Sequence, residues 1–254
     1  MSEHPPVHTD RRRAESFGAA AQEYDRYRPR YPPALIEALI VDDAPKVLDV
    51  GAGTGIASVQ LMEAGAQVLA VEPDARMARV AAGKGVRVER DTFEDWQPAD
   101  RSFDLVVFAQ SFHWVQPQLA LEKVASVLAP GGRLALVWNR ITPTSPTNDD
   151  LNEIYSDYLD TGERPSIETE NQATAILEEC GFALDRRHFV EELHYGCDDW
   201  LNMVFTFSNH LALEPLPRSE LRARLERTIG SAGVTARNDA LAVICSPRVS
   251  LPEP

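Results

Sequence analysis

Acidic residues and glycines follow the first two apolar runs of the chain. Residues 46–50 end in Asp49 and Val50, a G-A-G-T-G turn occupies 51–55, and the next apolar run ends at Glu72. Glycine allows a sharp backbone turn and lets a ligand approach without a Cβ atom in the way. A carboxylate after the second strand can accept hydrogen bonds from a ribose diol. The pattern predicts a nucleoside-bearing ligand across the ends of two parallel strands.

The spacing of the glycines distinguishes between nucleosides. The turn reads G-x-G-x-G, and Ile56 stands where the dinucleotide fingerprint has its third glycine. An acid before the glycines would repel a pyrophosphate but suits a ligand that carries an ammonium group. These features disfavour the alternative of an NAD-dependent oxidoreductase. A purely structural glycine turn in an α/β protein without a nucleotide is the other alternative.

The segment V-L-D-V-G-A-G-T-G at 47–55 and V-E-P-D at 71–74 resemble the first two motifs of class I S-adenosyl-L-methionine (SAM) methyltransferases. The resemblance implies SAM as cofactor and S-adenosyl-L-homocysteine as product. It also implies that Asp49 orients the glycine loop and the cofactor's amino group, and that Glu72 holds the ribose. The cofactor contacts expected from these motifs are Asp49, Gly51, Ala52, Gly53, Glu72, Pro73 and Met77.

The adenine contact is expected after the third strand, in V-E-R-D-T-F-E-D-W at 88–96. In the resembling family a polar side chain here faces the adenine amino group, and the next backbone N–H faces a ring nitrogen. Thr92 and Phe93 fall in these places. The common residue at the first place is Asp, so Thr92 is a departure, although a hydroxyl can also accept a hydrogen bond. A plain polar loop is the alternative.

The segment A-Q-S-F-H-W at 109–114 resembles a small-molecule subgroup related to trans-aconitate methyltransferases. The resemblance implies that Gln110 lines the methionine end of the cofactor. His113 titrates near neutral pH and is the candidate general base for a hydroxyl acceptor; alternatively, His113 and Trp114 only hold the loop. The residues expected to contact the acceptor are Trp114, Trp138 and Arg140.

An entry segment precedes the first strand: Phe17-Gly18, then Y-D-R-Y-R-P-R-Y-P at 24–32. It matches the same subgroup, in which this segment closes over the cofactor. Tyr24 is expected to cover the sulfonium or the substrate. Arg28 is expected to pair with a carboxylate of the cofactor or the substrate, because a guanidinium makes bidentate pairs. The alternative is that the segment only pins itself to the sheet.

Composition limits the class of partner. The 254 residues include 25 Lys plus Arg against 39 Asp plus Glu, a formal net charge of -14, which disfavours binding to nucleic acid. Three scattered cysteines form no metal motif, so no metal is implied. The N-terminal residues have no signal-peptide core, and no apolar run reaches the ~20 residues that span a bilayer. We expect a cytoplasmic protein without membrane contact; its oligomeric state stays open.

Strand and helix patterns alternate between residues 46 and 138, which predicts βαβ units and a parallel sheet. The expected fold is α/β, a doubly wound, seven-stranded, mainly parallel Rossmann-like sheet with an α-helical cap. The predicted strands are Lys46–Val50, Gln67–Glu72, Val86–Arg90, Phe103–Ala109 and Arg133–Trp138. The predicted helices are Ile56–Ala64, Ala75–Ala82 and Pro117–Leu128, the last one stopped by Pro130-Gly131-Gly132.

The remaining chain is expected to complete the sheet and cap it. Asn148 or Asp149 is expected to cap a helix that runs to about Leu159, within an acidic excursion over the sheet edge. Further elements are expected at Gln172–Cys180 (helix), Arg186–His194 (strand), Asp198–Leu211 and Arg218–Ile229 (helices) and Asp239–Cys245 (an antiparallel last strand). The predicted parts are an entry segment (1–33), a SAM-binding core (34–140), an acidic helical insertion or lid (141–171) and a C-terminal part with cap helices (172–254).

The sequence predicts a SAM-dependent methyltransferase that acts on a small-molecule acceptor, with a carboxylate or hydroxyl oxygen as the expected target. A SAM-binding regulatory protein without activity is the alternative, since its cofactor loop would look the same.

Overall fold

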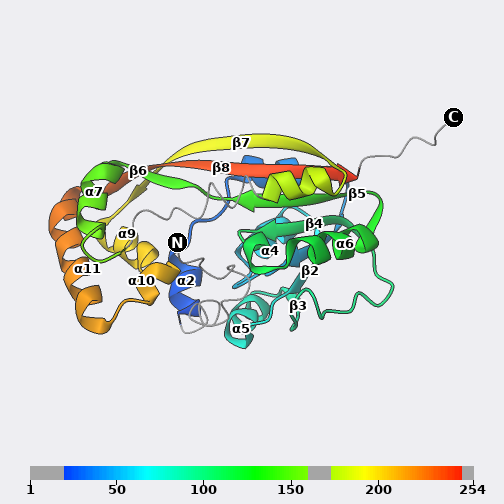
Figure 1. The fold of residues 1–254 in the computed structure, drawn as a ribbon, viewed down its shortest axis with the longest axis horizontal. Coiled ribbons are helices and arrows are strands. Elements are labelled where there is room, and N and C mark those ends of the chain that lie inside the picture. Colours follow the sequence, from blue (N-terminus) through cyan, green and yellow to red (C-terminus); the bar gives the residue numbers. More distant parts are fainter. Residues whose placement is uncertain (1–19, 160–172, 248–254) are drawn as a thin grey trace.

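The structure is a computed structural model that describes residues 20–159 and 173–247. Phe17 and Gly18 of the entry segment, residues 160–171 of the expected insertion and the last seven residues lie outside the described part. The described chain forms two lobes, which the two long strands β7 and β8 connect (Figure 1). Within these described ranges no helix is long and apolar enough to cross a bilayer.

The core lobe is built on parallel strands. They are β1 (Lys46–Val50), β2 (Gln67–Val71), β3 (Arg87–Glu89), β4 (Phe103–Ala109) and β5 (Leu128–Trp138). Along the sheet the order is β3-β2-β1-β4-β5-β8-β6, and β7 pairs with β8 off this path. The four pairings from β3 to β5 are parallel. The expected mainly parallel α/β sheet is confirmed, and its carboxyl-terminal edge is the edge at which such folds bind ligands.

Helices cover both faces of this sheet. On one face lie α3 (Pro33–Leu39), α4 (Ile56–Glu63) and α5 (Ala75–Gly83), which pack through Leu35, Leu61 and Ala81 among others. On the other face lie α6 (Pro117–Val127) and a helix over 173–179, which share a cluster with β1, β4 and β5. Burial on both faces explains why β4 reads as an almost continuous apolar run.

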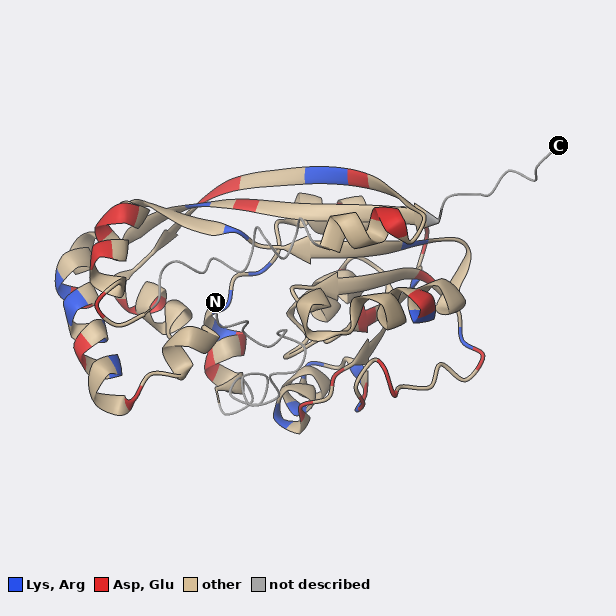
Figure 2. Cartoon of the chain, viewed as in Figure 1, with Lys and Arg blue, Asp and Glu red and all other residues tan. Residues whose placement is uncertain are grey.

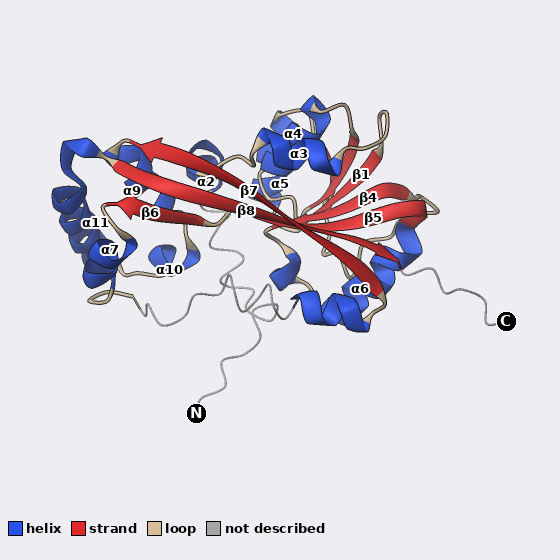
Figure 3. Ribbon diagram, turned by 90° about the horizontal axis from the view of Figure 1, so that it is seen from above, coloured by secondary structure: helices blue, strands red, loops and turns tan. Residues whose placement is uncertain are grey.

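Strands β7 (Phe182–Tyr195) and β8 (Val234–Pro247) pair antiparallel over their whole length. The other edge of β8 changes partner along the chain. Residues 241–245 pair with β5 in the core lobe, and residues 235–238 pair with β6 (Ile141–Ser145) in the second lobe. One pair of strands therefore belongs to both lobes (Figure 3).

The second lobe, here called the cap lobe, lies beyond the carboxyl ends of the parallel strands. Its helices are α7 (Asn148–Tyr155), α9 (Cys197–Val204), α10 (Ser208–Leu211) and α11 (Pro215–Ile229), followed by a 3-10 turn at Gly230–Ala232. They share a core that includes Leu151, Trp200, Leu201, Leu225 and Val234. The outer helix α11 carries both signs of charge (Figure 2). The expected helical cap is thus present.

Several expected boundaries were wrong for local reasons. Ile141–Ser145 is a strand on the edge of β8, where only a helical excursion was expected. Thr147, and not Asn148 or Asp149, caps α7, because its hydroxyl and the Asp150 carboxylate form a capping box. The segment Asp198–Leu211 divides into α9 and α10, and between them the Thr206 hydroxyl donates to the Met203 carbonyl. Strand β5 begins at Leu128, before the Pro-Gly-Gly sequence that was expected to precede it.

Asn238 lies where β8 passes from one lobe to the other. Its side chain is fully buried and donates to Asn139 Oδ1 and to Glu191 Oε1, both at 3.0 Å, and it accepts from the Arg140 N–H at 3.1 Å. Asn139 in turn donates to the Arg30 carbonyl at 3.1 Å. One amide thereby joins β5, β7, β8 and the entry segment.

We expect Asn238→Ala to lower the free energy of unfolding by about 1–3 kcal/mol, because it leaves buried polar groups without partners. Urea unfolding measures the change. Asn202→Ala is the control, since its half-buried side chain accepts one hydrogen bond from Arg222 and we expect a loss of about 0.5–1 kcal/mol. Equal losses in the two variants would show that the Asn238 network contributes nothing special.

Candidate functional site

The turn after β1 packs directly against the loop after β4. Gly51 has φ +66°, and a Cβ atom added to it would lie 2.7 Å from Ser111 Cβ. Ser111 is buried, and its hydroxyl donates to the Val50 carbonyl. The Gly51 and Ala52 N–H groups both face the Val71 carbonyl, at 2.8 and 3.3 Å. Gly51 is therefore required for close packing as well as for its backbone conformation.

Glu72 connects the ends of β1 and β2. Its side chain is buried, Oε2 accepts from the Gly53 N–H at 2.7 Å, and Oε1 accepts from the Asp74 N–H at 2.8 Å. Burial raises the pKa of Glu72 to about 7, against the opposing effect of these two hydrogen bonds. A carboxylate has about four acceptor positions, so the side chain retains capacity for hydroxyl donors of a ligand.

Asp49 lies at the end of β1 and is fully buried. Its Oδ2 accepts from the Ser58 hydroxyl of α4 at 2.6 Å, and Oδ1 has no hydrogen-bond partner among the described residues. Burial raises the pKa of Asp49 to about 6, although the Ser58 hydrogen bonds lower it. A buried carboxylate oxygen without a donor is a position where a cationic or donor group of a ligand would be stabilised.

Gln110 lies directly after β4 in an unusual conformation. Its φ is +56°, a region that non-glycine residues rarely adopt. The backbone N–H donates to the Val137 carbonyl at 2.9 Å, and the side chain hydrogen-bonds the Tyr31 hydroxyl. Such strain is held by the surrounding structure and is common at ligand sites. The Gln110 side chain therefore points toward Tyr31, which also interacts with Asp49.

Tyr31 brings the entry segment to this region. Its backbone N–H and carbonyl both bond the side chain of Gln60 on α4, at 2.9 and 2.8 Å. Burial, followed by the nearby Tyr24 and Asp49, raises the pKa of Tyr31 above its ordinary value. The hydroxyl is therefore protonated and available as a donor close to Asp49.

Helix α2 (Ala21–Tyr27) carries the remaining residues of the entry segment between the lobes. Asp25 pairs with Lys84, the residue directly after α5, at 2.5 Å. Arg28, just after α2, lies between the Tyr24 and Phe207 rings, with Cζ 4.7 and 4.2 Å from the ring centres. Its Nε donates to Thr206 Oγ1 at 2.8 Å. Tyr24 and Arg28 thus lie over the strand ends and against the cap lobe.

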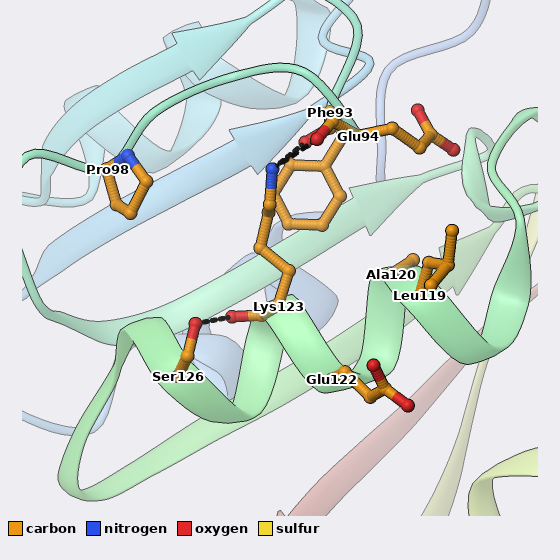
Figure 4. A pocket seen from close by; sticks show the side chains of 8 residues that line it. All are labelled: Phe93, Glu94, Pro98, Leu119, Ala120, Glu122, Lys123 and Ser126. Carbon is orange, nitrogen blue, oxygen red and sulfur yellow. Dashed lines mark hydrogen bonds between the residues drawn. The ribbon is translucent and has the colours of Figure 1, made fainter.

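Lys123 of α6 binds the loop after β3. Its ammonium donates to the Phe93, Glu94 and Trp96 carbonyls at 2.8, 2.6 and 2.8 Å, beside an open hollow of about 430 Å³ between this loop and α6 (Figure 4). The Phe93 ring is buried in the core, and the Thr92 hydroxyl donates to Asp95 Oδ2 at 2.9 Å. The Phe93 contact could therefore come only from its backbone, while the Thr92 hydroxyl accepts one hydrogen bond, from the Asp95 N–H at 3.2 Å, and can accept another. Both adenine contacts stay predictions.

The other predicted residues lie on the same edge in less specific surroundings. Pro73 is exposed, whereas Met77 is buried in α5. His113 and Trp114 lie in the 3-10 turn Phe112–Trp114 with ring centres 4.8 Å apart. Trp138 is buried in the core on the α6 face. Arg140 contacts β8 through its backbone, accepting from the Asp239 N–H at 3.1 Å. Their contacts with cofactor or acceptor stay predictions.

Ser58, Gln60 and Ser111 were not predicted from the sequence as site residues. Ser58 bonds the predicted Asp49 and Ser111 packs on the predicted Gly51, whereas Gln60 holds Tyr31, which was not predicted as a site residue either. Gln60 and Ser58 could have been suspected as polar residues on the buried face of α4. No signal in the sequence distinguishes Ser111 from an ordinary loop serine.

Known proteins resemble this chain in the region that forms the candidate site. The family model for the methyltransferase domain matches residues 48–136, from β1 into β5. The core lobe of this chain thus resembles that family over about a third of the chain. Over 126 residues the chain is 47% identical to an uncharacterized methyltransferase of Mycobacterium tuberculosis, which covers 49% of this chain and 52% of that relative. The chain therefore spans about half the length of the curated relatives that it matches at this identity.

Solved structures resemble the whole fold of this chain. A protein of Anaeromyxobacter dehalogenans described as a type II methyltransferase matches with a TM-score of 0.60 at 24% identity, over 89% of this chain and 100% of that one. A SAM-dependent methyltransferase of Thiobacillus denitrificans, in complex with S-adenosyl-L-homocysteine, matches with a TM-score of 0.50 at 16% identity, over 92% and 97%. The fold is that of class I methyltransferases.

We expect Gly51→Ala to destabilise the core lobe more than Gly53→Ala. Both glycines have positive φ, +66° and +57°, so both variants carry a backbone cost of about 1–2 kcal/mol. Only the Gly51 variant adds a collision with Ser111, because a Cβ at Gly53 meets nothing within 4 Å. Urea unfolding of both variants measures the difference, and equal losses would refute the packing role of Gly51.

The raised pKa of Asp49 predicts a pH-dependent stability of the ligand-free protein. The folded value of about 6 exceeds the ordinary value of ~3.9, so the stabilisation by the proton is complete below pH ~4 and is lost as the pH rises through about 6. Asp49→Asn removes this contribution. Between pH 5 and 8 the free energy of unfolding should fall by about 1 kcal/mol less in Asp49→Asn than in the wild type.

Chemical denaturation at a series of pH values measures this slope. Glu72 titrates in the same window in both proteins, so only the difference between them reports on Asp49. The exposed Asp43→Asn variant is the matched control and should keep the wild-type slope. Parallel curves for wild type and Asp49→Asn would contradict the assignment.

Proposed function

We propose that this chain is a SAM-dependent methyltransferase that acts on a small-molecule acceptor. The observation that carries the proposal lies at the adjacent ends of β1 and β2. There an unpartnered Asp49 oxygen, a positive-φ glycine turn and the buried Glu72 carboxylate lie together. The match to methyltransferases with S-adenosyl-L-homocysteine bound in one of them supports the cofactor.

The residues present fit this cofactor. A Cβ at Gly53 would meet nothing within 4 Å, so there is open space where a ligand can approach the turn. Asp49 Oδ1 would accept from the ammonium group and Glu72 from the ribose hydroxyls. Gln110 and the Tyr31 hydroxyl would hold the methionine end, and the Phe93 N–H would contact the adenine. When bound, SAM supplies a methyl group on a sulfonium.

The rest of the chain would position the acceptor. The cap lobe and α2 lie beyond the strand ends, so an acceptor between them and the core is shielded from water. Such orientation can lower a barrier by ~7–11 kcal/mol in favourable cases. We infer an oxygen acceptor: a carboxylate needs no base, and for a hydroxyl His113 is the candidate base. Trp114, Trp138 and Arg140 are proposed acceptor contacts.

The finer assignments extend the same proposal. Motifs at 24–32 and 109–114 support the subgroup related to trans-aconitate methyltransferases. The formal charge of -14 supports a small acceptor over nucleic acid, and we place the protein in the cytoplasm, without membrane contact. The entry segment would cover the cofactor, and the core would bind it. Residues 141–171 would cover the acceptor, and the C-terminal part would build the cap.

The first test compares ligands. We expect S-adenosyl-L-homocysteine to raise the melting temperature by several degrees and NAD to leave it unchanged. Incubation with methyl-labelled SAM and a panel of small acids and alcohols should then transfer label. Stabilisation by NAD alone would end the proposal, and binding without transfer to any acceptor would favour a regulatory SAM-binding protein.

A second prediction concerns the ribose contact. Glu72→Ala removes a buried acceptor from the proposed diol site, so SAM affinity should fall roughly 10–100-fold. Calorimetric titration measures the loss, and the exposed Glu63→Ala is the control. Because Glu72 also holds two backbone N–H groups, circular dichroism must show a folded variant. A folded variant with wild-type affinity would refute the assigned contact.

A further inference from the structure

A buried histidine in the cap lobe has an unused acceptor atom. His210 on α10 is 4% exposed. Its Nδ1 lies 2.9 Å from Asn209 Oδ1, which also accepts from the His210 N–H at 3.0 Å. Because an amide oxygen only accepts, Nδ1 carries the proton and Nε2 presents a lone pair. Nε2 is buried and has no hydrogen-bond partner among the described residues.

The imidazole of His210 is neutral. Burial, followed by the nearby Arg218 and Arg28 guanidinium groups, lowers the pKa of His210 to about 4. Above pH 5 the ring therefore acts as a hydrogen-bond acceptor at Nε2. Leaving such an acceptor without a donor in an apolar setting is costly, so a ligand that brings a hydroxyl or N–H group would be favoured.

The Arg28 guanidinium is a second group with unused capacity in the same place. Of its five donors, two are engaged, by Thr206 Oγ1 and by the Thr206 carbonyl. Burial lowers the pKa of Arg28, and the groups that oppose this are the Tyr24 and Tyr31 side chains, with no carboxylate among them. A half-buried cation with free donors and no acidic partner in the described chain is complementary to an anion.

His210 and Arg28 share an aromatic wall. Arg28 Cζ lies 4.2 Å from the centre of the Phe207 ring, and the His210 ring centre lies 6.1 Å from it, so the two groups are within about 10 Å of each other. The Tyr155 and Phe205 rings contact His210 edge-on at 5.5 and 5.2 Å. A buried acceptor atom and a cation therefore lie beside the same Phe207 ring.

We propose that His210 Nε2 and the Arg28 guanidinium are the two polar ends of the acceptor-binding site, and that the acceptor is a small hydroxylated carboxylic acid. Arg28 pairs with its carboxylate, and its hydroxyl donates to His210. This inference rests on the proposed methyltransferase function and names the substrate class of that site. It makes His210 a specificity-determining residue, because a site built to accept from a hydroxyl discriminates against the analogue that lacks it.

The test measures binding of matched pairs of acids to the protein saturated with S-adenosyl-L-homocysteine. The probes are lactate with propionate, malate with succinate, and 3-hydroxydecanoate with decanoate. For at least one pair, the wild type should bind the hydroxy acid at least tenfold more tightly. His210→Phe, which keeps an aromatic ring, should bind both members equally. His210→Gln, whose side-chain oxygen can accept, should regain part of the preference, and Arg28→Gln should lose both members.

The outcomes separate the two proposals. Calorimetry of S-adenosyl-L-homocysteine with His210→Phe reports folding and the cofactor site, and its affinity should equal that of the wild type. Absence of cofactor binding in the wild type would defeat the proposed function itself. Cofactor binding with no preference in any pair, or a preference that survives in His210→Phe, would overturn the role of His210. Loss of cofactor affinity with retained acid binding in Arg28→Gln would place Arg28 at the cofactor instead.

Discussion

Two carboxylates buried at the ends of adjacent parallel strands constrain the rest of this structure. Asp49 and Glu72 are 0% and 6% exposed, and burial raises the pKa of both. The folded chain satisfies them in part, through the Ser58 hydroxyl and the N–H groups of Gly53 and Asp74. Desolvating such groups costs free energy that core packing must offset. Retaining them is physically reasonable where a cationic ligand with hydroxyl groups completes their partners.

The glycine turn and the loop after β4 follow from that constraint. Two strand ends can be brought close to a ligand only if the backbone between them has no side chain in the way. Gly51 provides this by packing against Ser111, and the strained Gln110 directs its side chain toward Tyr31. These contacts pair residues about 60 to 80 positions apart, so the sheet must form before the site exists.

The cap lobe is joined to the core by continuous strands rather than by a linker. Because β7 and β8 pass through both lobes and Asn238 ties them to the β5 end and the entry segment, the relative position of the lobes is set by hydrogen-bonded backbone. Arg28 is held against Thr206 and Phe207 by the same arrangement. A rigid connection of this kind suits a site whose cofactor and acceptor halves come from different lobes.

The sequence alone determined the parallel core, because strand alternation is a local signal. It also predicted the residues proposed to bind the cofactor, from G-x-G-x-G and the acids at Asp49 and Glu72. It did not reveal β6, since T-P-T-S has no strand signal and its pairing depends on the distant β8. Nor did it reveal that α9 and α10 divide at Thr206. Ser58, Ser111, Asn238 and His210 acquire their roles only from neighbours far along the chain. Tertiary structure decided these because burial and hydrogen-bond partners are properties of the packed chain, not of a residue's type.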